Sequence, residues 1–134
     1  MTSRRLPEYE FVIEEKKMIF YAKDRVETVR EKAQGGEGRI AGRHPFKAED
    51  RPGGTSFKMI GEMTLERGCS IGFHVHKNDE EIYMINTGRG IYTDTDGQKY
   101  PVVPGDVTLT RRGEGHALAN DGDDPLIFTA VIAE

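Results

Sequence analysis

The stretch GCSIGFHVHKNDEEIYMINTG, residues 68–88, holds the strongest chemical pattern in this chain. It sets His74 and His76 two positions apart and places Glu81 five positions after the second histidine. A second patterned stretch farther along the chain, GDVTLTRRGEGHALAN, contains His116. Three of the chain's four histidines and one carboxylate therefore fall in two ordered blocks, a combination typical of a transition-metal site.

The spacing inside the first block suits metal binding if the block forms β-strands. Residues two apart on a strand point to the same face, so His74 and His76 are expected to project together. The polar run at 77–80 lets the chain reverse, which would bring Glu81 to the same ion on the neighbouring strand. The opposite face of the first strand is expected to hold Cys69, Ile71, Phe73 and Val75.

His116, on another strand, would complete a set of three histidines and one carboxylate. Four protein ligands of this kind leave coordination positions open, as catalytic sites do and structural zinc sites do not. Neutral imidazoles suit Fe, Mn, Ni, Co, Cu or Zn, so we expect one divalent transition metal ion per chain, its element undetermined. The ion could hold a substrate oxygen, activate water or bind dioxygen.

Short β-strands are expected from residue 56 onward. SFKMIGEMTLE, residues 56–66, alternates apolar and polar positions, which is the pattern of a strand with one buried face. Asp96-Gly97 separates GIYTDT from QKYPVV, and Asp-Gly between two such runs predicts a tight hairpin. PLIFTAVIA, residues 125–133, indicates an almost wholly apolar strand. Many short strands without a long helical stretch predict an all-β barrel or sandwich.

The first third of the chain has a weaker pattern. FVIEE (11–15) and MIFYA (18–22) are expected to be strands, and residues 47–54 a surface loop. DRVETVREKAQ (24–34) has a helix-forming composition but only a thin apolar stripe, so a short helix and an extended arm both remain open. We therefore expect residues 1–55 to pack on a barrel core of residues 56–134 within one structural domain.

Composition excludes several classes of function. The chain has 134 residues and a net charge of −4 without a basic stripe, which argues against nucleic-acid binding. Its one cysteine excludes an internal disulfide framework and a zinc ribbon. No apolar run is long enough to cross a membrane, and MTSRRLPEYE lacks the apolar core of a secretory signal. The glycine-rich run 35–38 lacks the lysine of a P-loop, which argues against a phosphate-binding loop there. Because the sequence shows neither a membrane span nor a secretory signal, we expect a cytoplasmic protein.

Both blocks resemble the motifs of the cupin superfamily. The first is similar to Gly-x5-His-x-His-x4-Glu-x6-Gly and matches each fixed position, at Gly68, His74, His76, Glu81 and Gly88. The second is similar to Gly-x5-Pro-x-Gly-x2-His-x3-Asn and matches at Gly105, Gly113, His116 and Asn120. Arg111 stands where that motif has its proline. The resemblance covers roughly residues 56–133 and points to small single-domain cupins.

The resemblance implies an all-β jelly-roll barrel with a metal ion inside it near one mouth. The implied ligands, by matching position, are His74, His76, Glu81 and His116. Small cupins also tend to dimerise through N-terminal strands. We therefore expect a homodimer in which the N-terminal segment covers barrel edges that would otherwise stay unpaired.

Three further residues are candidates for catalysis or specificity. Tyr83 shares strand parity with Glu81 and should point inward, either to act on a ligand or simply to pack in the core. Arg111 could hold a carboxylate or phosphate if it turns inward, although solvent exposure is the expected state. Glu114 is a spare general base or a solvated loop carboxylate. His44 is expected to be a loop histidine outside the metal site.

Two classes of function follow. We favour a small metalloenzyme acting on an anionic or polyhydroxy small molecule by oxygenation, decarboxylation, isomerisation or lyase chemistry. The alternative is a non-catalytic cupin that binds or senses a sugar or carboxylate. A purely structural metal is the third possibility, and it predicts that protein atoms block every metal position. Fold class cannot choose among these.

Overall fold

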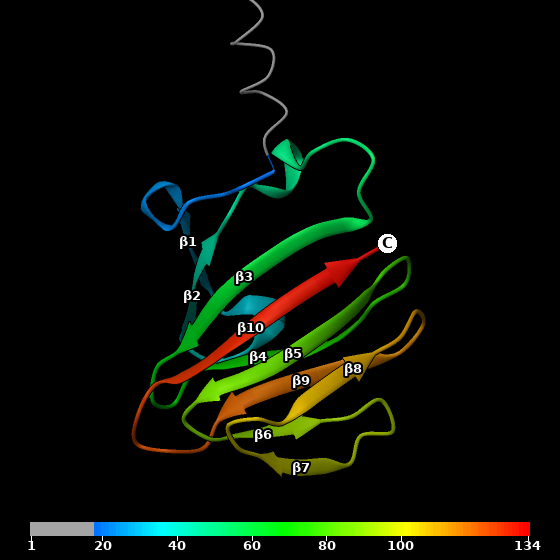
Figure 1. Cartoon of the computed structure of the whole chain (residues 1–134). Coiled ribbons are helices and arrows are strands. Elements are labelled where there is room, and N and C mark those ends of the chain that lie inside the picture. Colours follow the sequence, from blue (N-terminus) through cyan, green and yellow to red (C-terminus); the bar gives the residue numbers. More distant parts are fainter. Residues whose placement is uncertain (1–17) are drawn as a thin grey trace, which may run out of the picture.

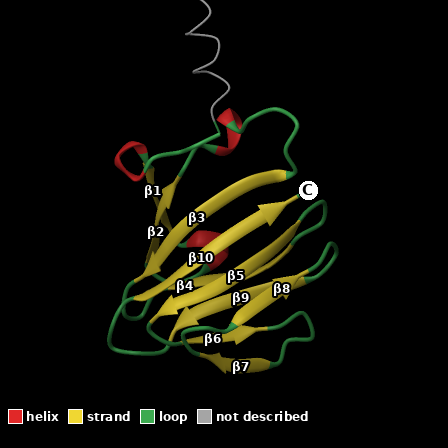
Figure 2. Ribbon diagram, in the orientation of Figure 1, coloured by secondary structure: helices red, strands yellow, loops and turns green. Residues whose placement is uncertain are grey.

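Two antiparallel β-sheets make up the protein, which a computed structural model describes for residues 18–134 (Figures 1 and 2). The larger sheet has the strand order β1-β2-β3-β10-β5-β8, with bounds Val26–Glu31, Arg39–His44, Phe57–Leu65, Leu126–Ala133, Glu80–Thr87 and Val107–Thr110. The smaller sheet has the order β4-β9-β6-β7, with bounds Ser70–Val75, Gly115–Asn120, Gly90–Thr93 and Lys99–Val102. Three short 3-10 helices occur in the described part, η1 (Ala22–Asp24), η2 (Ala33–Gly35) and η3 (Ala48–Asp50). The predicted all-β fold is confirmed.

The apolar patterns of the sequence explain the centre of this arrangement. β3 and β10 lie side by side, with Leu65 opposite Leu126 and Met63 opposite Phe128. Leu65, Leu126 and Phe128 are fully buried, because β10 runs between β3 and β5 in the middle of the larger sheet. Full burial of a side chain of this size stabilises the fold by about 1.5–3 kcal/mol.

The predicted Asp-Gly hairpin is present. β6 and β7 pair antiparallel, from Gly90 opposite Val102 to Thr93 opposite Lys99. Gly97 adopts a φ of 85° in the turn, and its N–H donates to the carbonyl of Asp94 at 2.9 Å. Glycine suits this position because a side chain would strain the left-handed backbone.

The N-terminal third differs from expectation at two places. Residues 18–21 are not a strand, so that prediction is wrong: the carbonyl of Tyr21 instead accepts the Asp24 N–H at 3.0 Å, which closes η1. The segment 24–34 resolves into strand β1 followed by η2, which favours the extended alternative over a helix. The loop expected at 47–54 contains η3. The strand expected at 11–15 lies outside the described residues.

Within residues 18–134, no helix has the length and hydrophobicity required to span a lipid bilayer.

Candidate metal centre

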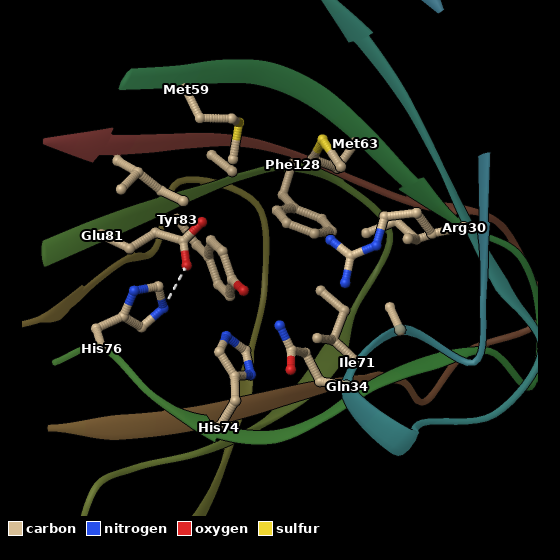
Figure 3. Close-up of a pocket in the computed structure, with 14 residues that line it drawn as sticks. Arg30, Gln34, Met59, Met63, Ile71, His74, His76, Glu81, Tyr83 and Phe128 are labelled. Atoms are coloured by element: carbon tan, nitrogen blue, oxygen red, sulfur yellow. Dashed lines mark ion pairs between the residues drawn. The ribbon is translucent and has the colours of Figure 1, made fainter. Parts of the chain in front are cut away.

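Three strands bring the four predicted ligands together. His74 lies on β4 directly opposite His116 on β9, so both rings share one face of the smaller sheet. His76 follows the last residue of β4, and Glu81 enters from β5 in the larger sheet. One ligand atom from each of the four residues lies within 4.8 Å of the other three. Figure 3 shows His74, His76 and Glu81 around one cavity.

The strict alternation predicted for β4 is broken. The register between β4 and β9 shifts between Ile71 and His74, which is a β-bulge or similar irregularity. Ile71 therefore lines the same cavity as His74 and His76, although its odd position predicted the opposite face. An extra residue in a strand reverses the face on which the side chains beyond it project. Phe73 and Val75 do follow the prediction and are exposed on the outer face.

The ligand atoms stand at separations that fit a common ion. Oε1 of Glu81 lies 3.0 Å from Nε2 of His76 and 3.1 Å from Nε2 of His116. The two imidazole nitrogens are themselves 3.1 Å apart. Ligands held about 2.1 Å from one metal ion at tetrahedral or octahedral angles lie about 3.0–3.4 Å from one another. The donor set and its geometry therefore fit a divalent transition metal.

A hydrogen-bond partner of Nδ1, on the side of the ring away from the ligand cluster, orients each histidine. Nδ1 lies 2.8 Å from the Gly72 carbonyl oxygen in His74, and 2.7 Å from a carboxylate oxygen of Asp79 in His76. In His116 it lies 2.7 Å from the hydroxyl of Thr110. With an ion bound, each ring would carry its proton on Nδ1, because the N–H then donates outward and Nε2 offers its lone pair to the metal. This arrangement is typical of metal-binding histidines.

A chain of charges continues outward from His76. The second carboxylate oxygen of Asp79 lies 2.7 Å from Nζ of Lys58, which is 3.9 Å from Glu134. Arg51 pairs with Glu134 at 2.7 Å. The sequence does not single out Asp79, because this residue lies in a polar run that is equally typical of an exposed turn. In the structure its residue is 8% exposed.

The site's charges are set by burial and by these contacts. Burial acts to raise the pKa of Glu81, but hydrogen bonds from His116 and His76 outweigh it, so the pKa is lowered and the group is ionised. The hydrogen bond to Glu81 raises the pKa of His76. Burial lowers the pKa of His74, which favours its neutral, metal-binding form. Burial also acts to raise the pKa of Asp79, and the hydrogen bonds from Lys58 and His76 outweigh it.

A cavity of about 110 Å³ opens onto the ligand set. Most of its wall is apolar, from Ala33, Ile40, Met59, Met63, Ile71, Phe128, Ala130 and Ile132. The polar lining consists of three of the ligands together with Arg30, Gln34 and Tyr83. Arg30 and Gln34 could not be placed from the sequence, because the segment that carries them could be a helix or an extended arm.

The three candidate catalytic residues lie in different places. Tyr83 is 2% exposed and lines the cavity, its ring stacked on His116 at a centroid distance of 4.7 Å. Burial raises its pKa well above the usual value, so the phenol stays neutral. Arg111 and Glu114 instead pair with each other at 2.7 Å, and neither lines the cavity. Catalytic roles for the three stay predictions.

His44 lies at the end of strand β2, so its expected place in a loop is wrong. The ring is buried, with Nδ1 2.9 Å from the Ile60 carbonyl oxygen and Nε2 3.0 Å from the Thr28 hydroxyl. Glycines at positions 42 and 61 leave the room that the ring fills. His44 does not belong to the ligand cluster found among the described residues.

Comparisons with known proteins place the chain in a family. The family model of the cupin domain matches residues 61–132. An oxalate-binding protein of Thermotoga maritima is 35% identical over 99 residues, which cover 74% of this chain and 79% of that protein. A gentisate 1,2-dioxygenase of a Ralstonia species is 39% identical over 51 residues, 38% of this chain but 14% of that enzyme. A solved structure, described as a predicted oxalate decarboxylase from Thermotoga maritima, shares 31% identity. It has a TM-score of 0.76 over 87% of this chain and 98% of its own. The chain belongs to the cupin family.

Proposed function

We propose that this cupin binds a small carboxylate anion at a divalent transition-metal ion, and that oxalate is the first ligand to test. The convergence of His74, His76, Glu81 and His116 within 4.8 Å carries the metal part of the proposal. The Thermotoga relative, named an oxalate-binding protein, supports the carboxylate part.

Charge at the site favours an anion. Three neutral imidazoles and one carboxylate leave a divalent ion with a net charge of about +1. Four protein ligands also leave open positions on an octahedral ion, where two oxygens of a carboxylate ligand fit. When bound, the ion would supply Lewis-acid chemistry toward those oxygens.

Cavity size favours a small ligand over a polyhydroxy sugar. The cavity measures about 110 Å³. Pockets for drug-sized molecules measure about 300–1,000 Å³. Only a ligand of a few heavy atoms can therefore be enclosed between the metal ligands and the apolar wall.

The lining favours binding without turnover. Apart from the metal ligands, the ionisable groups on the cavity wall of the described chain are Arg30 and Tyr83. A guanidinium does not deprotonate in proteins, and burial raises the pKa of Tyr83 well above its usual value. Proton transfer near neutral pH would need a group that titrates in that range. Turnover of the ligand is the second candidate function, and the decarboxylase description of the similar Thermotoga structure supports decarboxylation in particular.

We also propose that the protein forms a homodimer. The outer face of the larger sheet carries exposed apolar side chains, with Met84 on β5 next to Val107 on β8 and Leu109 farther along. A second copy would cover such a surface. Light scattering coupled to size-exclusion chromatography measures the mass, and a mass near 15.0 kDa would contradict the dimer.

Metal analysis and calorimetry test the main proposal. Protein purified without added metal is examined by mass spectrometry, then loaded and titrated with oxalate by isothermal titration calorimetry. We expect stoichiometric metal in the wild type and oxalate binding by the loaded form alone. Glucose is the control ligand and His76→Ala the control variant. Equal oxalate binding by metal-free protein would contradict the proposal. Carbon-13 NMR of labelled oxalate detects turnover, which would favour the second candidate.

A further inference from the structure

We propose that Arg30 and Gln34 bind the end of the ligand that points away from the metal ion, so that the cavity selects a short dicarboxylate over a monocarboxylate. The inference rests on the proposed function and extends it to residues outside the metal-binding motifs. One end of the ligand would be bound by the ion, and the other end by Arg30 on β1 and Gln34 in η2, which connects β1 to β2.

Arg30 reaches the cavity because of its position on β1. It lies directly opposite Ile40 on β2, and opposite residues in an antiparallel pair share a face. Ile40 is buried and lines the cavity, so the Arg30 side chain is directed there as well. Figure 3 shows the guanidinium of Arg30 and the amide of Gln34 pointing into the space that His74 also borders.

The Arg30 guanidinium has no carboxylate partner within 4.0 Å among residues 18–134. Most of the cavity wall is apolar, and Figure 3 shows Met63 and Phe128 near Arg30. The carboxylate among the described residues that line the cavity, Glu81, already contacts His76 and His116. A guanidinium presents paired N–H donors that match the two oxygens of a carboxylate, which makes it suited to the distal end of an anion.

Gln34 is held in a conformation that non-glycine residues rarely adopt. Its φ of 53° and ψ of 32° are left-handed, and Lys32 two positions earlier has a φ of 48°. Such backbone persists only where the surroundings impose it, and it occurs preferentially at functional sites. Here it turns the Gln34 side chain toward the cavity (Figure 3).

Close packing of η2 on β4 imposes this conformation. A Cβ atom at Gly36 would collide with the Ser70 carbonyl, and one at Gly72 would collide with the carbonyl of Gln34. Ser70 and Glu37 also exchange two hydrogen bonds, each of 2.9 Å. Because β4 carries His74, the same strand fixes one metal ligand and the position of Gln34.

The two ends of the cavity therefore offer complementary partners. A metal ion with a net positive charge would hold one carboxylate, and the Arg30 guanidinium with the Gln34 amide would hold the other. Both residues are exposed at the cavity mouth, so a ligand can reach them from solvent. A monocarboxylate such as acetate would use the metal end alone.

Calorimetry on the metal-loaded full-length protein tests this assignment. Oxalate and malonate are the dicarboxylate probes and acetate is the monocarboxylate probe. In Arg30→Met we expect oxalate affinity to fall about 10- to 100-fold, because a charge-assisted bidentate contact is lost. In Gln34→Ala we expect a loss of about 3- to 10-fold. Acetate affinity and metal content should stay at their wild-type values in both variants.

Arg39→Met is the matched control. Arg39 lies on the same hairpin, next to Ile40 in sequence and therefore on the opposite face of the sheet, and it does not line the cavity. Arg30→Lys is the second variant. It keeps the positive charge but lacks the paired N–H donors of the guanidinium, so it should lose less affinity for oxalate than Arg30→Met. Circular dichroism establishes that each variant is folded.

The outcomes separate the two proposals. Wild-type protein that binds oxalate, with Arg30→Met and Arg30→Lys unchanged in affinity, would overturn the distal anchor alone. Equal losses for oxalate and acetate would also overturn it, because the effect would then not be confined to the distal end. Wild-type protein that binds metal but neither carboxylate would overturn the proposed function and this inference together.

Discussion

Asp79 accepts a hydrogen bond of 2.7 Å from Nδ1 of His76, and this contact orients the imidazole from outside the cavity. Lys58 holds the other carboxylate oxygen of Asp79 at 2.7 Å. The metal-facing nitrogen of His76 is thus positioned by a buried carboxylate that is itself fixed by an ammonium group.

We predict that Asp79→Ala lowers metal affinity about 10- to 100-fold, the usual effect of removing the partner of a metal-binding histidine. The His76 ring would lose its orientation while all four ligands remain. Competition with a chromophoric chelator measures the affinity. Asp123→Ala is the control, because that side chain is 87% exposed and lies 3.7 Å from Arg67. Equal affinities in the two variants would show that Asp79 does not position the ring.

His76→Ala and His44→Ala should separate metal binding from folding. The first removes a ligand and should sharply lower metal content. The second should leave metal content unchanged and reduce the free energy of unfolding by about 1–3 kcal/mol, since a buried ring and its part-buried hydrogen bonds to Thr28 and Ile60 are lost. Mass spectrometry and urea denaturation measure the two quantities. Full metal content in His76→Ala would disprove its assignment as a ligand.

Glu114 should titrate far below an ordinary glutamate. Hydrogen bonds from the side chain and backbone of Arg111 lower its pKa to about 2. A carboxyl group whose pKa is depressed by folding stabilises the folded state above its unfolded pKa, near 4.5, and loses that contribution as the pH falls toward 2. Carbon-detected NMR of the carboxyl resonance measures the midpoint. Arg111→Gln should move the midpoint back toward 4.5, and an unchanged midpoint would refute the pairing in solution.

The contact between η2 and β4 should be sensitive to a single methyl group. In Gly36→Ala the new Cβ would collide with the carbonyl of Ser70, so we expect the free energy of unfolding to fall by about 1–3 kcal/mol. Gly53→Ala is the control, because no atom lies within 4 Å of its added Cβ and its φ is not left-handed. Chemical denaturation followed by circular dichroism compares them. Equal stability would mean that η2 does not pack on β4 as described.

The barrel could be predicted from the sequence because its strands carry clear local signals. Alternating apolar residues predict β3, and an Asp-Gly pair predicts the turn between β6 and β7. The two motifs contain the four ligand candidates. The bulge before His74 could not be predicted, because it depends on how β4 pairs with β9. Binding of an ion by those four residues and a cytoplasmic location stay predictions.

The distal half of the cavity could not be predicted for a different reason. Arg30 lies in a segment whose few apolar residues fit a helix and a strand equally well. The left-handed conformation of Gln34 opposes local preference and results from packing against β4, which begins at Ser70, 36 residues farther along the chain. Interactions between segments this distant in sequence leave no local periodicity.

Glu81 belongs to the larger sheet, whereas His74 and His116 lie on the smaller one and His76 directly follows its strand β4. An ion held by all four would cross-link the two sheets, and it would stabilise only the folded chain. Proteases in the cell act mainly on molecules that have opened, so chains lacking the ion would be degraded first. The lifetime of this protein, and with it the amount present in the cell, would then depend on the supply of the metal, whether or not the carboxylate ligand is present.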